Sequence, residues 1–502
     1  MNNELVNTKS KKLVKSYFDE NAIVQSDIES YNDFVNNRLE DIATRHDDIE
    51  PTILPDEIDD FHVEFDDIKV HEPRITEADG STRRLLPSEA RLRELSYTAP
   101  IELEVTSYVE GEERDNFTTQ IGQMPVMLQS DYCHLTDMSR DELIEASEDP
   151  DDEGGYFIIN GTEKVLVGVE DLAANRFGVD TKRTGAVDYV GKIYSEEGSY
   201  KIPHRIEKKK DELFYTSFTR VKSAPLVVVV KALGLLNDEE IMQQVGLPDA
   251  SEVFVNLMAF SDITEREEAL DHIAKKMGIT QAKEVRIERV EEILDEYLLP
   301  HIGQEPEHRH VKALNLLKYL KHYIHVLHDD LEETDKDHYG NKRIKLAGDL
   351  LADLFQVNMK VLTGDLTYNF QRMVKRGKFP DVKSIIREKL LTQRVMSAMA
   401  TGNWVGGRTG ICQRIERINY LSMLSSLQRV VSPLSSSQEN FGARSLHTTH
   451  MGRLCMTETP EGQNIGLRKN LAMLSRVTGD LDENQLLDKL TDLGLEAEAE
   501  SL

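Results

Sequence analysis

Apolar and polar positions follow several different periods along this chain. Residues 1 to about 60 have the pattern of helices broken by acid-rich turns. From residue 101 to about 170, short runs rich in Val, Ile, Phe and Tyr are separated by Gly, Asn and Asp, which predicts antiparallel strands joined by turns. Asn160-Gly161, with apolar runs on both sides, is the strongest hairpin signal in the sequence.

A second mixed segment follows, in which "ELFYTSFTRV" and "APLVVVVKAL" are predicted to be strands. The next helix is predicted to begin at a cap on Asn237, with Glu240 three residues later, and to end at Gly246. Helical spacing returns from about 262 to 330, and again after "DKDHYGNKR" to about 400. The sequence then becomes rich in Gly, Ser and Thr, and the last 25 residues form an acidic helix-like tail.

Length and composition narrow the class of protein. A chain of 502 residues predicts two to four domains. With 39% hydrophobic residues, no apolar stretch near the roughly 20 residues of a spanning helix and no apolar signal-peptide core, we expect a cytoplasmic protein without a membrane segment. The three cysteines are isolated from one another, which excludes a closed four-cysteine metal site.

Charge is distributed unevenly around a formal net charge of −30. From residue 339 to 476 there are 21 Lys and Arg residues against 9 Asp and Glu residues, so a basic segment lies within a strongly acidic remainder. Such asymmetry points to an acidic polymer as partner at one part of the chain. For the acidic part alone, a solubility role in a salty cytoplasm is an equally good explanation.

Two candidate enzymatic motifs compete with simpler structural explanations. "GNWVGGRT", residues 402–409, has Walker A spacing with Arg408 in place of Lys, but a helical pattern precedes it where a phosphate loop requires a strand. In "HYIHVLH", His322 and His325 can share one helix face, whereas His328 is rotated away. Histidines on a polar helix face explain this pattern better than a metal site.

The histidines near residue 450 offer another incomplete metal set. His447, His450 and Cys455 supply three ligands for zinc, but no fourth is near, and structural zinc is almost always four-coordinate. We expect the histidines to brace a loop instead.

The basic segment is the stronger functional signal. We expect Lys383, Arg387 and Arg394 to share one face of a helix whose other face is apolar. Further basic residues then interrupt Gly-, Ser- and Thr-rich loops, which allow a polyanion to approach closely; they are Arg408, Arg414, Arg417, Arg429, Arg444, Arg453, Arg468 and Lys469. The pattern favours a nucleic-acid surface over a solvated face.

The stretch "HTTHMGRLCMTETPEGQNIGLRKNLA" resembles the signature of the second-largest subunit of cellular multisubunit RNA polymerases. Five other stretches resemble that family in the family's order: "RLLPSEARLRELSYTAPI", "GGYFIINGTEKVLV", "DKDHYGNKRIKLAGDLL", "ATGNW" and "RINYLSMLSSLQRVVSP". The resemblance covers residues 85 to 480. The wording of these motifs and the length of the chain are similar to those of B″, the N-terminal half of the split B chain of archaeal DNA-directed RNA polymerases.

This resemblance implies an α+β multidomain fold with the family's architecture. A discontinuous protrusion of mixed strands and helices would comprise 1–176 and 344–397, with a lobe inserted at 177–343. A fork would follow at 398–480, and an acidic C-terminal tail at 481–502.

The resemblance also implies a role without catalytic residues in this chain. The family's catalytic aspartates, which bind Mg²⁺, lie in the largest subunit, and Zn²⁺ lies in partner subunits, so no cofactor is expected in this chain. The assembled enzyme would be a nucleotidyltransferase, and this chain alone would be inactive. Its partners would be the DNA template, the RNA–DNA hybrid, the C-terminal half of B, the halves of the largest subunit and the assembly subunits.

By resemblance, several fork residues would contact nucleic acid. Gln413 and Arg429 correspond to residues that face the hybrid, and Glu461 and Asn464 lie in a turn that backs onto nascent RNA. Arg408, Arg444 and Arg453 join this set because they belong to the basic segment and arginine binds phosphate bidentately. The stretch 434–443 corresponds to fork loop 2, near the separating downstream strands, and includes Leu434, Ser437, Asn440 and Ala443.

One departure and one alternative belong with this hypothesis. Ser426 and Val431 occupy positions where bacterial members have residues of the rifamycin pocket, so inhibitor binding is not inferred. The alternative function, from another class, is a free-standing metal-dependent hydrolase that uses His322 and His325.

Overall fold

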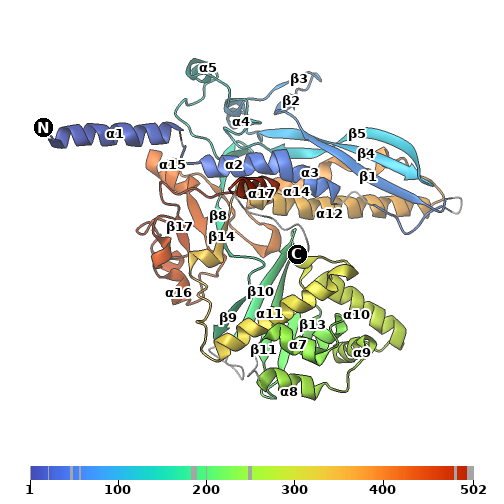
Figure 1. The fold of residues 1–502 in the computed structure, drawn as a ribbon. Coiled ribbons are helices and arrows are strands. Elements are labelled where there is room, and N and C mark those ends of the chain that lie inside the picture. Colours follow the sequence, from blue (N-terminus) through green and yellow to red (C-terminus); the bar gives the residue numbers. More distant parts are fainter. Residues whose placement is uncertain are drawn as a thin grey trace. The chain divides into compact units, whose positions relative to one another are not determined.

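The chain divides into two compact units (Figure 1). The structure, a computed structural model, describes residues 2–20, 22–45, 49–55, 58–181, 189–198, 200–246, 251–479 and 483–493. Unit 1 consists of residues 1–171 and 344–502, and unit 2 of residues 172–343. The architecture is mixed α/β, with several sheets and many helices.

Unit 1 begins with the helices that the sequence predicts, α1 (Asn2–Glu20), α2 (Gln25–Asp33) and α3 (Leu39–Thr44). A π-helical turn, η1 (Phe34–Arg38), joins the last two. The aromatic rings of Tyr31 and Phe34 are fully buried, and the Tyr31 hydroxyl donates a hydrogen bond of 2.9 Å to the Pro125 carbonyl. This helical segment is therefore anchored to the sheet of the same unit.

The main sheet of unit 1 is antiparallel, with strand order β1-β4-β5. Along β1 and the middle of β4, buried residues alternate with partly exposed ones, as expected of a sheet with one face in the core. A two-stranded hairpin and two short helices accompany it. The elements are β1 (Phe61–Val70), β4 (Thr98–Val109), β5 (Glu112–Pro125), β2 (Arg74–Thr76), β3 (Thr82–Arg84), α4 (Pro87–Leu92) and α5 (Arg140–Glu145).

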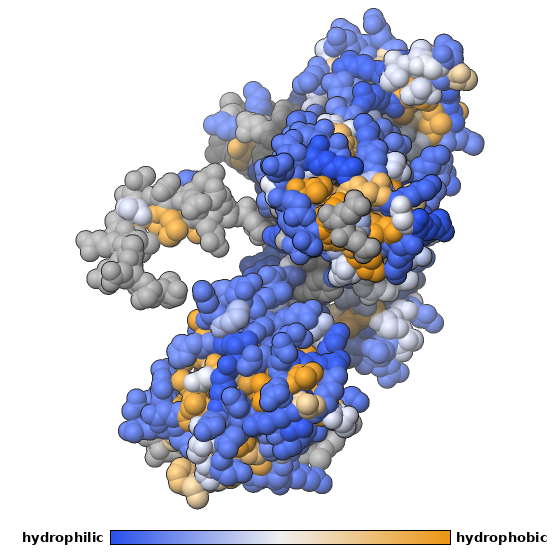
Figure 2. Space-filling view, turned by 90° about the vertical axis from the view of Figure 1, so that its right-hand side faces the viewer, coloured by the Kyte–Doolittle hydropathy of each residue, from blue (hydrophilic) through white to orange (hydrophobic). Residues whose placement is uncertain are grey.

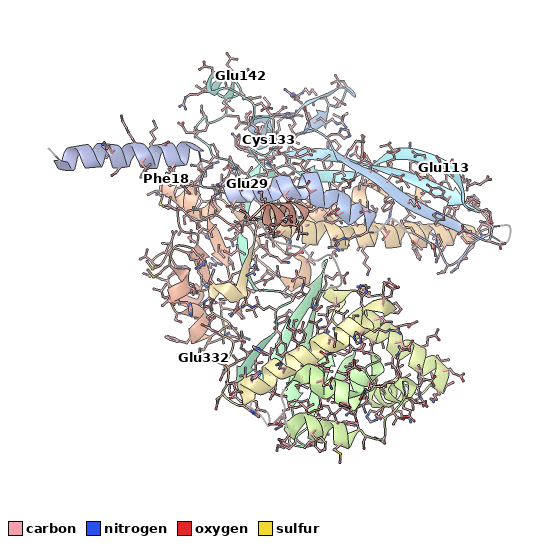
Figure 3. All side chains as sticks on the ribbon, viewed as in Figure 1. Phe18, Glu29, Glu113, Cys133, Glu142 and Glu332 are labelled. Carbon is pink, nitrogen blue, oxygen red and sulfur yellow. The ribbon has the colours of Figure 1, made fainter. Side chains whose placement is uncertain are left out.

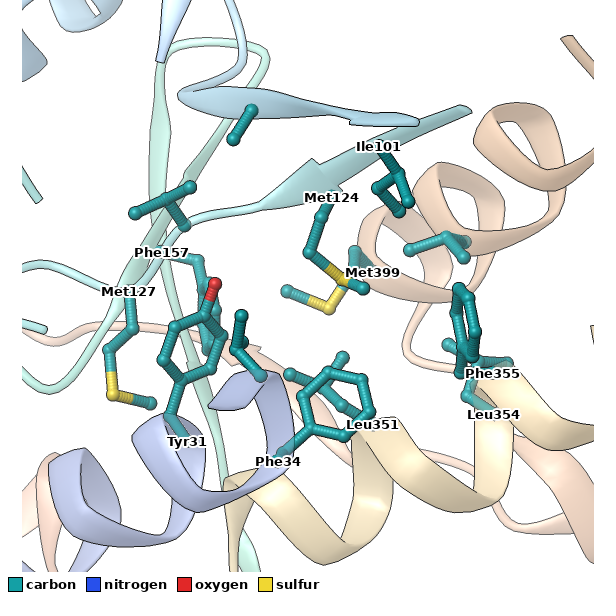
Figure 4. Packing of buried hydrophobic residues seen from close by; sticks show 14 of the residues in the cluster. Tyr31, Phe34, Ile101, Met124, Met127, Phe157, Leu351, Leu354, Phe355 and Met399 are labelled. Atoms are coloured by element: carbon teal, nitrogen blue, oxygen red, sulfur yellow. The ribbon is translucent and has the colours of Figure 1, made fainter. Parts of the chain in front are cut away.

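Three helices from the second part of unit 1 complete its core: α12 (Ala347–Val374), α13 (Val382–Ile385) and α14 (Glu388–Thr401). Helix α12 packs against α2, and α14 packs against β5. Figure 4 shows part of the shared cluster, which includes Tyr31 of α2, Phe34 of η1, Phe355 of α12 and Met399 of α14. The rings of Phe34 and Phe355 pack edge to face with centroids 6.3 Å apart. Segments that are more than 300 residues apart in the sequence thus share one hydrophobic core.

Two small sheets carry the region that was predicted to be the fork. One has the order β15-β7-β6 and the other β14-β8-β16-β17, in which β8 and β16 are parallel. The Asn160-Gly161 hairpin between β6 and β7 is confirmed. The elements are β6 (Phe157–Ile159), β7 (Thr162–Leu166), β8 (Gly168–Leu172), β14 (Lys342–Lys345), β15 (Cys412–Arg414), β16 (Arg429–Val431), β17 (Arg468–Asn470), α15 (Tyr420–Leu427) and α16 (Phe441–Arg444).

Unit 2 has its own antiparallel sheet, with strand order β13-β12-β11-β10-β9, and its own hydrophobic core. Its strands are β9 (Gly178–Thr181), β10 (Tyr189–Glu197), β11 (Tyr200–Lys208), β12 (Phe214–Phe218) and β13 (Val221–Pro225). Its α-helices are α6 (Leu226–Ala232), α7 (Asp238–Val245), α8 (Ser251–Ala259), α9 (Arg266–Met277), α10 (Lys283–Tyr297) and α11 (Arg309–Leu327).

The structure corrects two predictions of local structure. "APLVVVVKAL" is not a strand: β13 ends at Pro225 and the valines form α6, in which all seven residues are buried. The predicted helix through Lys383 and Arg394 is broken, because Arg387 has extended backbone geometry between α13 and α14. By contrast, Asn237 caps α7 and Gly246 ends it in the left-handed conformation, as predicted.

The C-terminal segment returns to α2. The guanidinium group of Arg476 lies 2.9 Å from the carboxylate of Glu29, which Figure 3 labels on α2, and the backbone N–H of Val477 donates to Ser26. The acidic helix α17 (Glu483–Asp492) follows, and residues 481–482 and 494–502 of the predicted tail lie outside the described residues. Across the described part of the chain, no helix is both long and apolar enough to span a bilayer.

Candidate nucleic-acid interface

The Gly-rich loop after α14 is an exposed turn held at its base. Gly402 ends α14 with a φ of +75°, and Gly406 and Gly407 also have positive φ, which glycine adopts without strain. The indole N–H of Trp404 donates 2.9 Å to the Leu350 carbonyl and fixes the loop to α12. The helix that precedes the loop confirms that this is not a Walker A motif.

Arg408 leaves this loop to form an ion pair with Asp171 at the end of β8. Both side chains are largely buried, with 21% and 11% of their surface exposed. Arg408 is therefore held by a carboxylate of the same unit, and a phosphate would have to compete with that carboxylate for it.

Gln413 and Arg429, predicted from the resemblance to face the same ligand, are in direct contact. Gln413 lies on β15 and Arg429 begins β16, and an Nη1–H of Arg429 donates 3.1 Å to Oε1 of Gln413. The carboxylate of Glu416 is more distant, 3.9 Å from Arg429 Nη2. The arginine thus makes one neutral hydrogen bond and one weak ion pair, which leaves its charge largely uncompensated.

Arg444 organises two loops through backbone carbonyl groups. Its Nη1 donates to the carbonyls of Gln463 (2.7 Å) and Ile465 (3.0 Å), and its Nη2 donates to those of Ser436 (2.9 Å) and Gln438 (3.2 Å). One guanidinium group therefore joins the predicted fork loop 2 to the turn at 461–466. No pattern in the sequence indicates this role.

The predicted fork loop 2 residues are spread over an exposed segment. Leu434 is 38% exposed, and the hydroxyl groups of Ser437 and Ser435 are 2.8 Å apart. Asn440 precedes the single turn α16, which contains Ala443. All four residues belong to one short segment of the chain. Within that segment, Arg444 donates hydrogen bonds to the carbonyls of Ser436 and Gln438.

The turn that contains Glu461 and Asn464 is held by Thr459. The Thr459 hydroxyl donates 3.0 Å to the Arg468 carbonyl and accepts from the backbone N–H of Gly466 at 2.8 Å. Residues 462–464 form a 3₁₀ turn that starts directly after the exposed Glu461. At Gly466 (φ +71°) an added Cβ would overlap the Arg444 carbonyl oxygen, so the two loops pack closely there.

The histidines near this turn hydrogen-bond within their own loop. Nδ1 of His447 accepts from the backbone N–H of Thr449 at 3.2 Å, and Nδ1 of the buried His450 accepts from the N–H of His447 at 3.4 Å. Arg453 is exposed and donates 3.1 Å to the Thr449 carbonyl. Among the described residues, Arg453 makes no hydrogen bond to Gln413 or Arg429.

A buried ion pair that flanks β16 was not predicted. Lys469 on β17 and Glu170 on β8 are 2.8 Å apart, and only 8% and 3% of their side-chain surfaces are exposed. Because β16 lies between these strands, the pair crosses the strand that carries Arg429. A shift in register that separated these two side chains would leave buried charges without a partner. The ion pair therefore favours a single register of the three strands.

Several other cations of the basic segment are held by side chains of unit 1, among them Arg417, which pairs with Glu163 and Asp152, whereas Arg414 is exposed. Arg387 forms an ion pair with Asp365, Arg394 donates 2.6 Å to Asn358, and the Lys383 ammonium lies 5.6 Å from the centre of the Phe117 ring. The continuous cationic helix face expected from the sequence is therefore absent from this described segment.

In unit 2 the histidines of α11 have separate neighbours. His322 meets the edge of Phe177, Nδ1 of His325 is 3.2 Å from Asp330, and Nε2 of His328 is 2.8 Å from Glu252. Over the described ranges, no group of three or more His, Cys, Asp or Glu side chains is arranged to hold a metal ion.

Comparison with known proteins identifies the family. The family model described as RNA polymerase beta subunit matches residues 22–397, and the model of RNA polymerase Rpb2, domain 3, matches residues 413–477. The resemblance inferred from the motifs is thereby confirmed, and the hydrolase alternative is wrong.

Relatives with curated names agree over nearly the whole chain. DNA-directed RNA polymerase subunit Rpo2N of Methanocaldococcus jannaschii is 41% identical over 97% of this chain and 99% of its own length. Subunit Rpo2N of Halobacterium salinarum is 38% identical over 97% of this chain and 96% of its own length. Subunit Rpo2 of Saccharolobus solfataricus is 41% identical over 96% of this chain, which spans 43% of that longer protein. The chain therefore belongs to the RNA polymerase beta subunit family, the family of the second-largest polymerase subunits.

Proposed function

We propose that this chain is a subunit of a multisubunit DNA-dependent RNA polymerase that forms part of the wall of the DNA and RNA–DNA hybrid channel. One observation carries the proposal: the second family match, residues 413–477, includes both members of the Gln413–Arg429 pair, whose arginine has a largely uncompensated charge. The relatives named Rpo2N are polymerase subunits, and the chemistry of RNA synthesis would belong to the assembled enzyme.

The family architecture suggests a domain assignment. Unit 2, residues 172–343, would be the lobe. The sheet β1-β4-β5 with α12 and α14 would belong to the protrusion, and the region from 398 to 480 would be the fork. The observation that supports this assignment is the discontinuity of unit 1, whose two sequence parts flank unit 2.

Arg429 is the residue most suited to a nucleic-acid phosphate or to the hybrid. Its guanidinium is oriented by Gln413, and in the described part of the chain its ion pairing is limited to the long 3.9 Å contact with Glu416. A planar cation held in this way can bind phosphate bidentately without first losing a strong ion pair. Glu461, Asn464 and Arg453 remain proposed contacts because of the exposed turn and loop that carry them.

Arg408 and Arg444 would act differently within the same wall. Arg408 shares its charge with Asp171, and Arg444 uses both terminal nitrogens on loop carbonyls. Arg444 has carbonyl partners and keeps its positive charge, which attracts a polyanion at long range, whereas the charge of Arg408 is balanced by Asp171. Contact through Leu434, Ser437, Asn440 and Ala443 would follow from the position of their loop.

Metal chemistry would belong to other chains of the assembly. Mg²⁺ would be bound by the aspartates of the largest subunit and Zn²⁺ by partner subunits, while this chain would supply no cofactor ligand. The partners would include the DNA template, the hybrid, the C-terminal half of B, the largest subunit and the assembly subunits, all meeting in the cytoplasm.

The test is an Arg429→Ala substitution in a reconstituted polymerase, with retention of a DNA–RNA scaffold measured against salt concentration. If Arg429 neutralises one phosphate, the slope of log affinity against log salt falls by about 1. Arg140→Ala is the matched control, because Arg140 is 65% exposed and pairs with Asp151 outside the basic segment. Equal slopes for both variants would remove Arg429 from the contacts, and failure of the chain to join the assembly would contradict the subunit proposal itself.

A further inference from the structure

Unit 2 contains a preformed cavity of about 180 Å³ beside its edge strand β9. The Phe177 ring in its wall is immobilised: it stacks on Tyr319 with centroids 4.8 Å apart and covers Gly191, where a Cβ would lie 2.5 Å from the ring. Thr334, which also lines the cavity, exchanges hydrogen bonds of 2.9 and 3.0 Å with the backbone of Val179. These contacts set the shape of the cavity without any ligand.

The charged groups that line the cavity are predominantly cationic. Arg176, Lys192 and Lys336 face a single carboxylate, that of Asp180, of which 12% of the side-chain surface is exposed. The two ammonium groups lie 3.4 Å and 2.8 Å from it. Three cations against one anion leave two positive charges that no other lining residue balances.

The donors of Arg176 are also incompletely used. Its Nη1 donates 2.9 Å to the Gly340 carbonyl, which orients the guanidinium group. Within the described ranges, its remaining N–H groups have no hydrogen-bond partner. A cavity with two surplus positive charges and oriented, unused donors matches an oxyanion that carries two negative charges.

We propose that this cavity is a binding site for a phosphate-class dianion. At about 180 Å³ it is smaller than the roughly 300–1,000 Å³ of cofactor-sized pockets, so it would take inorganic phosphate or the phosphate group of a small monoester. Lys192 and Lys336 supply charge, and Arg176 supplies directed hydrogen bonds. The site lies entirely within residues 172–341 and does not depend on the proposed channel function.

The experiment titrates the full-length chain with sodium phosphate in low-salt buffer by calorimetry, against sodium chloride at equal ionic strength. We expect saturable binding that the Lys192→Met/Lys336→Met double substitution weakens by at least about tenfold, because methionine keeps the apolar stem and removes both charges. Lys222→Met is the matched control, since Lys222 is exposed on β13, the opposite edge strand of the same sheet. Ribose 5-phosphate in a parallel titration identifies the source of the phosphate: tighter binding than inorganic phosphate indicates a monoester, and weaker binding indicates the free ion.

A gain-of-binding variant guards against loss through misfolding. Asp180→Asn removes the competing carboxylate and is expected to tighten phosphate binding about tenfold, a result that an unfolded protein cannot produce. Binding that is the same in the wild type, the double variant and Asp180→Asn would overturn the proposal, as would heats no larger with phosphate than with chloride.

Discussion

Arg429 and Arg444 differ in what holds their guanidinium groups, and this difference separates two functions that look alike in the sequence. Arg429 is oriented by one side-chain amide, whereas Arg444 donates to four backbone carbonyls in two loops. Backbone carbonyl groups are present whatever the side chain, so the partners of Arg444 do not depend on the identity of the loop residues. Arg444 therefore acts as a structural clamp between the two loops. We expect it to position the loops, with any contact to nucleic acid as an additional role.

Arg444→Ala should therefore loosen both loops in the isolated chain. Four carbonyls lose their donor, so amide hydrogen exchange should increase at 436–438 and at 463–465 together, by about tenfold or more. Arg453→Ala is the matched control, because Arg453 donates to the Thr449 carbonyl within its own loop and does not join the two loops. Increased exchange in only one loop would contradict the clamp.

Asp27 provides a prediction about pH. Burial raises the pKa of its carboxyl group from 3.8 to about 7, a hydrogen bond from the Ala347 backbone lowers it in part, and the nearby Asp349 raises it further. Oδ1 of Asp27 is buried and has no hydrogen-bond partner in the part of the chain that the structure describes. The ionised form is therefore poorly accommodated in the folded chain.

The folded chain binds more protons than the unfolded chain between pH 3.8 and about 7, so this group's contribution to stability falls as pH rises through that window. Asp27→Asn should remove the loss and stabilise the chain at pH 8 by roughly 2–4 kcal/mol, at about 1.4 kcal/mol per pKa unit. Melting midpoints from pH 5 to 8 test this, with Glu29→Gln, exposed on the same helix, as control. If the melting midpoints of the wild type and Asp27→Asn changed in parallel with pH, the prediction for Asp27 would be contradicted.

At the scale of elements, the crossing of α2 and α12 depends on one glycine. A Cβ at Gly348 would overlap the Ser30 carbonyl oxygen, so the two helices approach through bare backbone. The N–H of Gly348 also donates 3.2 Å to the Ser30 hydroxyl. This contact joins the two sequence-distant parts of unit 1.

Gly348→Ala should destabilise unit 1 by about 1–3 kcal/mol, because the added methyl group must push the helices apart. Gly364→Ala in the same helix should instead stabilise it by roughly 0.5–1 kcal/mol, since nothing lies within 4 Å of its added Cβ and alanine favours helix. If packing decides the effect at Gly348, urea denaturation will show a lower free energy of unfolding for Gly348→Ala and a higher one for Gly364→Ala. If both substitutions increased the free energy of unfolding, helix propensity would decide the effect at both sites.

Local sequence patterns predicted those elements that are fixed by their own backbone geometry. They failed where tertiary contacts determine the secondary structure. Asn237, Gly246 and Asn160-Gly161 act through their own backbone geometry, so their effects are visible in the sequence. The valines of α6 are buried on every side, which removes the periodicity that separates helix from strand. The break at Arg387 accompanies its pairing with Asp365 on α12, a contact between distant segments that no local pattern records.

The candidate site shows the same limit. Gln413 and Arg429 were paired through the family resemblance, and their spacing alone does not predict a 3.1 Å contact between β15 and β16. The Lys469–Glu170 pair joins residues 299 positions apart, and the carbonyls that Arg444 binds carry no sequence signal at all. Charge counts located the basic segment but could not separate Arg429, whose ion pair is long, from Arg387 and Arg408, which are held by close carboxylates.

At the scale of the whole molecule, the two units have separate hydrophobic cores. The first core draws on residues 24–169 and 347–427, and the second on residues 179–326, with no shared member among the described residues. The described part of the surface in Figure 2 is largely hydrophilic, in keeping with 30% charged residues. The backbone N–H of Ala173 donates 2.9 Å to the Asn341 carbonyl, so the chain enters and leaves unit 2 at neighbouring points.

Residues 172–343 should therefore fold alone, because an independent core and adjacent ends are what an inserted domain requires. We expect the excised segment to melt cooperatively in a calorimeter, while the full chain shows two transitions. The control segment 172–300 lacks α11, which contributes Leu316, Leu317 and Leu320 to the core, and should remain unfolded because its remaining apolar groups lose their partners. If 172–343 were as disordered as this control, the second core would depend on unit 1, and the assignment of unit 2 as an inserted lobe would lose its physical basis.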